Sequence, residues 1–344
     1  MTTTESFLTA FGFDQHCVEL PPVEDNSMEW LRRRREGIGA SDISALFGLI
    51  NPDWADTFTL WLDKTNQVPL DDGPPSEPAF WGHVLEEPVR NVACDRLGVS
   101  VHKPNTLRSI HLPFMRYSPD GIMSDRRLYE GKTANAYKAS EWKGQIPDHA
   151  ELQVQGGMYV TGAEQTVVAG LIGGQHLELF EVDRDERVIK HILDVCERFW
   201  THNVMGGVEP EMGGGKAATD ALKILHGRKS GARKLPVDEI RDAHERYHAH
   251  HAAEKAAKLA KQKAANELRN KMKGHQALVG SDDKVWAAIK AGTFAHAKFR
   301  DKYPDLYAAH LVPTHSLDTA ALKSAHPAEY AEFQAQTLDV KDMS

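Results

Sequence analysis

The sequence of 344 residues lacks the features that mark several large classes of protein. Its three cysteines, Cys17, Cys94 and Cys196, are odd in number and show no CxxC spacing, so neither a disulfide framework nor a zinc or iron–sulfur site is indicated. No segment approaches the roughly 20 apolar residues that span a bilayer, and the polar start MTTTESF has no secretory-signal pattern. We therefore expect reduced, buried thiols and a cytoplasmic location, with no membrane partner.

An excess of positive charge is also missing. The chain has 41 Lys and Arg residues against 49 Asp and Glu residues, a net charge of −8, so it has no global electrostatic footprint for nucleic acid. Any DNA binding must come from local clusters of cations. The apolar content of 41% is ordinary for a globular protein, which excludes disordered and fibrous classes, and the length allows one large or two ordinary cores.

The central stretch of the chain is YSPDGIMSDRRLYEGKT, residues 117–133. If 128–133 is a strand, Glu130 and Lys132 share one face because they are two residues apart. The SDRR turn would fold 121–123 back against this strand and bring Asp120 to the same place. Two carboxylates and an ammonium group would then converge, as metal-assisted phosphodiester cleavage requires, although the same charges could also form a surface salt-bridge ladder.

Four consecutive arginines, residues 32–35, precede a break at GIG. One interpretation is a solvated basic helix face or a charge run of the nuclear-localisation type. The other is a phosphate clamp, in which Arg34 or Arg35 acts with the hydroxyl of Ser41. In that interpretation Ser41 caps the N-terminus of a helix that extends through Phe47.

The pattern of elements predicts an α/β protein. A helix over 78–97 ends at Gly98, and Pro88 is expected to kink it near Glu86 and Glu87, an acidic pair that on its own usually faces solvent. Short strands, predicted to form an antiparallel meander, are followed by a helix, two strands and a second helix. The predicted strands are 99–103, 106–111, 114–118, 121–123, 128–133, 165–173 and 176–183, and the helices are 148–161 and 186–205. This order predicts a sheet flanked by helices.

The composition changes after residue 208. We expect an N-terminal arm (1–27), a main domain (28–208), a linker (209–236) and a mainly helical C-terminal region (237–344) with a small β-hairpin around Asp282–Asp283. The GGGK segment of the linker is not a nucleotide site, because Ala217 replaces the required Ser or Thr. Residues 237–273 predict a helical hairpin or coiled-coil arm. Its HAHH cluster at 248–251 is more typical of solvated histidines than of a metal site, and one or two last helices are expected within 317–334.

Four ordered blocks resemble the YqaJ-type viral recombinase branch of the PD-(D/E)XK nucleases, whose best-known relative is the phage lambda exonuclease. They are the Arg…GIGASD block at 34–42, GxxLE at 82–86, SPDG followed by EGK at 118–132, and QVQGGMYVTG at 153–162. The tail LDTAALKSAHPAEYAEF at 317–333 resembles a segment that often accompanies this phage branch. The resemblance implies a restriction-endonuclease-like core, a mixed sheet flanked by helices.

The resemblance also implies a metal site. In the family pattern Asp120 and Glu130 bind Mg²⁺ or Mn²⁺, as two ions, with help from the backbone carbonyl of Gly131. Lys132 then positions the nucleophilic water. Glu86 would complete the metal site, and the neighbouring Glu87 is an arguable alternative.

Two further assignments follow from the resemblance. Gln155 is expected to be a further polar residue at the site, whereas Tyr159 is expected to be a packing partner. Relatives place a phosphate-binding arginine seven residues before the serine, which favours Arg34 over Arg35 as the partner of Ser41.

The function implied is a metal-dependent exonuclease that acts on double-stranded DNA and supplies single strands to a phage recombination or annealing protein. Relatives include a toroidal trimer, so a homo-oligomer is an open alternative. The other interpretations are an inert nuclease fold kept for DNA binding or assembly, and a restriction-like or Cas4-like endonuclease, the latter weakened by the missing cysteine ligands. Strand polarity and processivity stay open.

Overall fold

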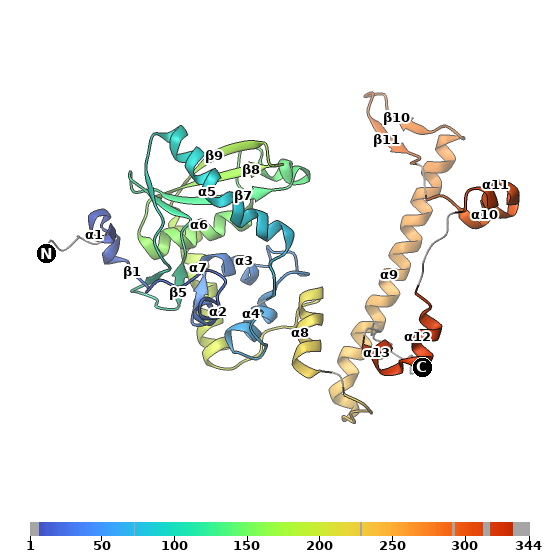
Figure 1. Cartoon of the computed structure of the whole chain (residues 1–344), viewed down its shortest axis with the longest axis horizontal. Coiled ribbons are helices and arrows are strands. Elements are labelled where there is room, and N and C mark those ends of the chain that lie inside the picture. Colours follow the sequence, from blue (N-terminus) through green and yellow to red (C-terminus); the bar gives the residue numbers. More distant parts are fainter. Residues whose placement is uncertain (1–6, 72, 228, 291–292, 312–316, 333–344) are drawn as a thin grey trace. The chain divides into compact units, whose positions relative to one another are not determined.

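The computed structural model describes residues 7–71, 73–227, 229–290, 293–311 and 317–332. The chain divides into two compact units, an N-terminal unit (Met1–Ser230) and a C-terminal unit (Gly231–Ser344) (Figure 1). Among the described residues there is no helix with the length and apolar character that crossing a membrane requires. All three cysteines are free and buried, and burial raises the pKa of Cys17 and of Cys196 to about 12.

The N-terminal unit is built on a five-stranded mixed sheet. Its order is β3 (Val101–His102), β6 (Gly121–Met123), β7 (Leu128–Ala134), β8 (Gln165–Ile172) and β9 (His176–Asp183). All neighbours are antiparallel except β7 and β8, which are parallel and are connected through helix α6 (Asp148–Thr161). A parallel pair needs such a crossover, because its strands run in the same direction. The expected α/β class, a mixed sheet flanked by helices with a mainly helical C-terminal region, is confirmed.

A second sheet of four strands corrects the predicted meander. Its order is β1 (Cys17–Glu19), β4 (Leu107–Ser109), β5 (Met115–Tyr117) and β2 (Ile38–Gly39). β5 pairs with β4 and with β2, and not with β6, so the predicted run of strands is split between two sheets. The sequence could not show this, because the partners β1 and β2 lie far upstream. Part of the N-terminal arm thus contributes a strand to the main unit.

Short-range hydrogen bonds explain where the helix and the turn at the edge of the site begin. Helix α2 (Met28–Arg35) is capped by Ser27, whose side chain accepts a hydrogen bond from the Trp30 amide. Ser41 does not cap a helix as expected. It lies inside a short 3₁₀ turn (Ala40–Asp42) before α3 (Ile43–Leu46), and the Asp42 carboxylate accepts the Gly39 amide instead. The site is therefore bordered by a tight turn in place of a capped helix.

Helix α5 (Glu77–Leu97) runs through Pro88 as one element and ends at Gly98, which takes the left-handed conformation (φ 67°). It packs on β7 and β8 and covers a small apolar cluster that includes Val89, Ala93 and Tyr129. Helix α6 packs against α7 (Glu186–Arg198) and against β4 and β5 of the four-stranded sheet. The remaining elements of this unit are α1 (Phe7–Phe11), η1 (Phe13–Gln15), α4 (Thr57–Lys64), η3 (Ala136–Trp142) and the π-helical turn η4 (Phe199–Met205).

The stretch 209–236, expected as a linker, contains helix α8 (Lys216–His226). This helix packs on α4, and Ala218 is buried in the main apolar core. The apolar residues on one side of the helix explain why it folds onto the N-terminal unit.

The C-terminal unit consists mainly of α9 (Val237–Met272), a single helix of 36 residues and not a helical hairpin. A two-stranded hairpin, β10 (Ala277–Val279) and β11 (Val285–Ala288), follows, and Asp283 in its turn has a positive φ of 56°. The last described elements are α10 (His296–Lys302), α11 (Pro304–Ala309), α12 (Thr319–Ala325) and α13 (Pro327–Glu332).

Candidate functional site

The hairpin of β6 and β7 brings the predicted acids together. Its register places Gly121 opposite Tyr129, so Asp120 stands beside Glu130 across the hairpin. The turn that joins the strands uses Arg126 in the left-handed region (φ 75°). The Asp120 carboxylate accepts the Gly131 amide at 2.8 Å. The acids are therefore fixed by backbone geometry and not only by flexible side chains.

Glu130 is held by three donors. Lys132 Nζ lies 2.7 Å from Glu130 Oε1, and Gln153 Nε2 donates to the same oxygen at 2.6 Å. The Tyr117 hydroxyl donates to Oε2 at 3.2 Å. The Glu130 side chain is only 2% exposed, and Gln153 also accepts a hydrogen bond from Lys132 at 2.9 Å. A buried carboxylate with this many donors has a fixed orientation.

Asp120 has too little positive charge around it. Burial and the nearby charge of Glu130 raise the pKa of Asp120 to about 8, with a further contribution from Glu86, against the opposite effect of Lys132. Burial alone would lower the pKa of Lys132, but Glu130 and Asp120 hold that pKa above its usual value. Lys132 is therefore a cation at neutral pH, and it is shared by more than one acid.

Helix α5 presents Glu86, and not Glu87, to this centre. Glu86 lines the same pocket as Asp120, and its carboxylate accepts hydrogen bonds from Arg90, at 3.1 Å, and from Lys103. Arg90 also donates to the backbone oxygen of Asp120 at 3.0 Å, which ties α5 to the start of β6. Glu87 is exposed on the helix surface. Of the two glutamates left open by the sequence, Glu86 is the one that lines the cavity.

The oxygens gathered here are of the kind that hard divalent cations take as ligands. They belong to Glu86, Asp120 and Glu130, and the amide of Gly131 contacts the second of these acids. In the described ranges no group of three or more His, Cys, Asp or Glu side chains is already arranged to hold a metal ion. The reason is visible in the contacts: Glu86 is turned toward Arg90 and Lys103, and Glu130 toward Lys132.

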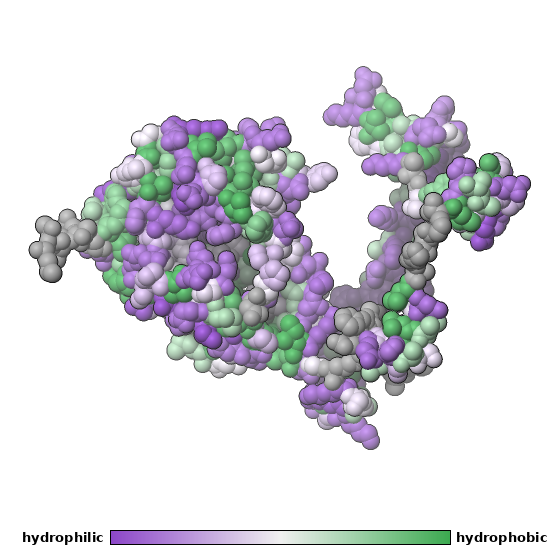
Figure 2. Space-filling view, in the orientation of Figure 1, coloured by the Kyte–Doolittle hydropathy of each residue, from purple (hydrophilic) through white to green (hydrophobic). Residues whose placement is uncertain are grey.

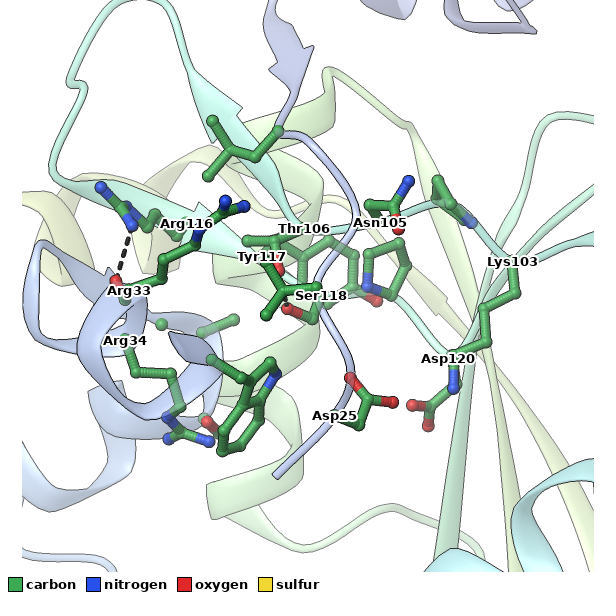
Figure 3. Close-up of a pocket in the computed structure, with 18 of the residues that line it drawn as sticks. Asp25, Arg33, Arg34, Lys103, Asn105, Thr106, Arg116, Tyr117, Ser118 and Asp120 are labelled. Atoms are coloured by element: carbon green, nitrogen blue, oxygen red, sulfur yellow. Dashed lines mark hydrogen bonds between the residues drawn. The ribbon is translucent and has the colours of Figure 1, made fainter. Parts of the chain in front are cut away.

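A cavity of about 490 Å³ opens beside the acids. Figure 3 shows Arg33, Arg34 and Arg116 on one side of it, and Lys103 and Asp120 on the other. The Arg34 guanidinium lies 4.8 Å from the centre of the Trp30 ring, and its side chain is 43% exposed. Arg34 and the exposed Ser41 both line the cavity, as the phosphate-clamp interpretation requires.

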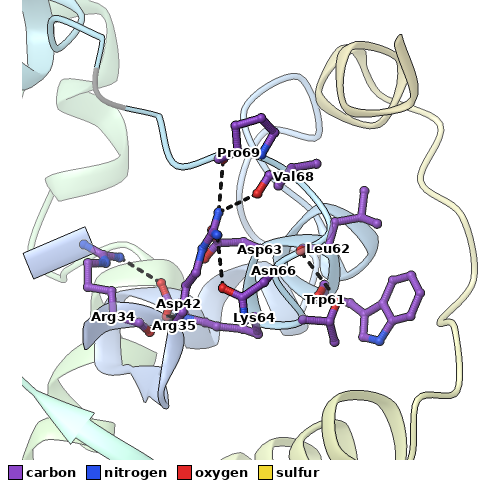
Figure 4. Close-up of polar contacts among 11 residues, drawn as sticks. Arg34, Arg35, Asp42, Trp61, Leu62, Asp63, Lys64, Asn66, Val68 and Pro69 are labelled. Atoms are coloured by element: carbon purple, nitrogen blue, oxygen red, sulfur yellow. Dashed lines mark hydrogen bonds and ion pairs between the residues drawn. The ribbon is translucent and has the colours of Figure 1, made fainter. Parts of the chain in front are cut away.

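Arg35, the alternative to Arg34, has a different role. It is buried and binds Asp63 at 2.8 Å, Asn66 at 3.2 Å, and the backbone oxygens of Val68 and Pro69 (Figure 4). These contacts connect α2 to the last turn of α4, through Asp63, and to the segment that follows α4. Arg35 thus stabilises the fold and has no donor directed into the cavity. Its inclusion among phosphate-binding residues needs correction.

Gln155 is also not at the site. It is fully buried, donates to the Asp183 oxygen at 2.8 Å and accepts the Asp185 amide at 3.0 Å, so it supports the end of β9. Gln153, two residues earlier, is the glutamine that contacts Glu130 and Lys132. Two residues correspond to about 200° around a helix, so only one of them can face the acids. Tyr159 packs against the main core as expected.

Gly157 on α6 keeps Tyr117 in place. A Cβ atom at position 157 would lie 2.8 Å from the Tyr117 ring, closer than packed atoms approach. The ring therefore occupies space that only glycine leaves free, and from there its hydroxyl reaches Glu130.

Residues 29–164 match the family model of the YqaJ-like viral recombinase domain. Over 288 residues the chain is 31% identical to the uncharacterized protein YqaJ of Bacillus subtilis strain 168, which covers 81% of this chain and 89% of that protein. The chain belongs to the YqaJ family.

Two solved structures are similar in outline. LHK-Exo, an alkaline exonuclease from Laribacter hongkongensis, in complex with dAMP, is 18% identical with a TM-score of 0.46, over 53% of this chain and 94% of that one. A phage-related exonuclease from Haemophilus somnus 129PT is 11% identical with a TM-score of 0.31, over 57% of this chain and 100% of that one. With TM-scores below 0.5, neither likeness bears on function.

Proposed function

We propose that this protein is a divalent-metal-dependent DNA nuclease. The observation that carries the proposal is the convergence of Asp120, Glu130 and Lys132 at the β6–β7 hairpin, beside a cavity with arginines on its opposite side. Carboxylates, an ammonium group and a cationic rim together suit the hydrolysis of a phosphodiester. The name of the matching family model, a viral recombinase domain, agrees with DNA as the substrate.

The donor set fits Mg²⁺ or Mn²⁺. Asp120 and Glu130 would be the central ligands, with Glu86 and the Gly131 carbonyl beside them. The raised pKa of Asp120 supports this assignment, because it reflects negative charge that a bound cation would offset. One or two such ions would polarise the phosphate and make water a better nucleophile.

The residues of the chain have separate tasks in this proposal. Lys132 remains protonated, so it orients the attacking water and offsets charge on the phosphate and does not act as a base. Tyr117 and Gln153 keep Glu130 in its orientation. Arg34, with the Ser41 hydroxyl, would bind a phosphate of the substrate at the far side of the cavity.

A phage-type exonuclease that starts at a duplex end and leaves single strands for a recombination or annealing protein is the finer form of this proposal. That form, like assembly into a ring, rests on the family resemblance. The alternative, an inert copy of the fold that only binds DNA, is tested by the same assay.

The test is digestion of a linear duplex, labelled at either end, and of a covalently closed circle, each with Mg²⁺ and with EDTA. We expect the linear duplex to be degraded only with Mg²⁺, and Lys132→Ala to lower the rate by about 10²–10³-fold, as the loss of one transition-state contact does. Lys138→Ala is the matched control, because Lys138 is an exposed lysine paired with Glu141 in the same unit.

Unchanged circular dichroism and melting would show that Lys132→Ala is folded. Full activity of that variant, or of the wild type in EDTA, would refute the proposal. Degradation of the closed circle would support nuclease activity but refute the proposal that the protein is an exonuclease that needs a duplex end.

A further inference from the structure

Helix α9 is divided by charge. Residues 237–254 carry five acids and two arginines, whereas residues 255–273 carry seven Lys or Arg residues and a single acid, Glu267. The contrast with the rest of the chain is large, because residues 1–230 have 34 acids and only 23 cations. The second half of α9 is thus a local concentration of positive charge in an acidic protein.

Within this half, part of the charge lies in one line. Residues spaced three and four apart share a helix face. The members of this line, here called the cation stripe, are Lys255, Lys258, Gln262, Asn266, Arg269 and Lys273. All six are exposed, and the visible face of α9 is largely hydrophilic (Figure 2). At 1.5 Å per residue the stripe is about 27 Å long.

The contacts along the stripe leave its charge largely uncompensated. Arg269 donates to the Asn266 amide oxygen at 3.2 Å, and Gln262 donates to the same oxygen at 2.9 Å. Lys273 donates to Asn270 at 3.2 Å. The carboxylate contact along the stripe is that of Lys258 with Glu254, at 3.7 Å and at the acidic end. Glu267 is at least about 100° away around the helix from the nearest stripe residue.

This pattern suits a polyanion. Cations three or four residues apart repel one another in the free helix, and a row of phosphates would relieve that repulsion. Duplex DNA carries about one charge per 1.7 Å of its axis, and its major groove, about 12 Å wide, accepts an α-helix. The amides of Gln262 and Asn266 are donors that can also reach phosphate oxygens or base edges.

We propose that the cation stripe of α9 is a DNA-binding surface, separate from the candidate nuclease site. It would give an acidic nuclease its affinity for the polyanionic substrate. The choice of DNA over other polyanions rests on the proposed function, whereas the position of the surface rests on the stripe itself.

The test measures binding by the full-length protein in EDTA, where no cleavage is expected, to a labelled duplex of about 30 base pairs. The stripe double variant is Lys258→Ala with Arg269→Ala. Its matched control is Lys261→Ala with Lys271→Ala, which removes the same charge from exposed positions of the same helix but off the stripe. Each change places alanine in a helix, so helix propensity favours both variants.

We expect the stripe variant to bind about 10-fold more weakly, and the slope of log K against log salt to fall by about 1.8, since each lost phosphate contact removes about 0.9. The control variant should change affinity less than about 2-fold. Equal losses in both variants, or none in either, would overturn the proposal. An RNA duplex of the same sequence, bound more tightly, would overturn the choice of DNA.

The two proposals fail separately. Loss of binding in the stripe variant, with no cleavage by the wild type in Mg²⁺, would refute the nuclease and support the surface. Cleavage by the wild type, with equal binding by the stripe and control variants, would refute only the surface.

Discussion

Two lysine–carboxylate pairs of the N-terminal unit can be compared, because both have a nitrogen–oxygen distance of 2.7 Å. The first joins Lys64 to Asp42, with side chains 1% and 10% exposed. The second joins Lys132 to Glu130 at the candidate site, with side chains 23% and 2% exposed. The distance and the burial of the carboxylate alone would place the two pairs in one category.

Their surroundings differ in charge balance. Asp42 also meets Arg34 at 3.0 Å and accepts the Gly39 amide. Burial alone would raise the pKa of Asp42, but Lys64 and Arg34 hold it below the usual value. At the candidate site the acids outnumber the cation they share, and the pKa of Asp120 is raised. An acid whose negative charge is balanced by nearby cations, such as Asp42, supports the fold. A cluster with excess negative charge, such as the one at the candidate site, would be stabilised by a bound cation.

The largest expected effect comes from breaking the compensated pair. Lys64→Ala should lower the free energy of unfolding by about 3 kcal/mol, because it leaves Asp42 buried with only part of its positive charge. Urea denaturation in EDTA measures this. Lys138→Ala, at an exposed pair, should cost less than about 0.5 kcal/mol. If Lys64→Ala matched this control, the structural role of the pair would be refuted.

Replacing an acid should change the free energy of unfolding in opposite directions at the Asp42 pair and at the candidate site. Asp42→Asn should destabilise the protein, whereas Asp120→Asn should stabilise the metal-free protein by about 1–2 kcal/mol, because it removes a buried carboxylate from like charges. The side-chain oxygen of the introduced amide can still accept the hydrogen bond from Gly131. The same variant should lose nuclease activity. Destabilisation by Asp120→Asn in EDTA would contradict the proposed charge imbalance.

The pH dependence sharpens this contrast. The folded pKa of Asp120, about 8, lies above the unfolded value of about 3.9, so its ionisation opposes folding increasingly as pH rises between them. The stabilisation by Asp120→Asn should therefore grow from about pH 5 to about pH 8. The folded pKa of Asp42 is lowered, so its contribution is complete above the unfolded pKa and is lost only as pH falls through the folded value. The effect of Asp42→Asn should be flat over the same range.

The smallest expected effects separate the two glutamines of α6. Gln153→Ala should lower nuclease activity about 5-fold with little change in melting, because one hydrogen bond to Glu130 is worth about 1 kcal/mol. Gln155→Ala should keep activity and cost about 1–3 kcal/mol of stability, because it leaves the Asp185 amide without its buried acceptor. Activity assays and denaturation of both variants check this. The reverse assignment of losses would restore Gln155 as the site residue.

The sequence predicted what depends on local geometry. Strand spacing and a short turn were enough to place Asp120, Glu130 and Lys132 together, because a hairpin is a contact between neighbours in the chain. Glu86 required the family spacing, and its position on the cavity side of α5 agrees with it. Their roles in metal binding stay predictions.

What the sequence could not supply is the orientation of helices in space. Arg34 and Arg35 differ by about 100° around α2, and only the packing of the segment after α4 shows which one is buried. Gln153 and Gln155 are the same residue type, so no signal in the chain distinguishes them. The split of the predicted meander has a different cause, because β1 and β2, the partners of its strands in the second sheet, are distant in sequence.

Gly157 shows how a site can be constrained by an atom that is missing. This glycine has no side-chain functional group. The Tyr117 ring packs against it, however, and the hydroxyl of that ring donates a hydrogen bond to Glu130. Even a methyl group there would have to displace Tyr117 or shift α6, and α6 also carries Gln153. Which residues are tolerated at position 157 is thus determined by how precisely the Glu130 carboxylate on β7 must be oriented. A survey of tolerated substitutions should therefore find few at position 157.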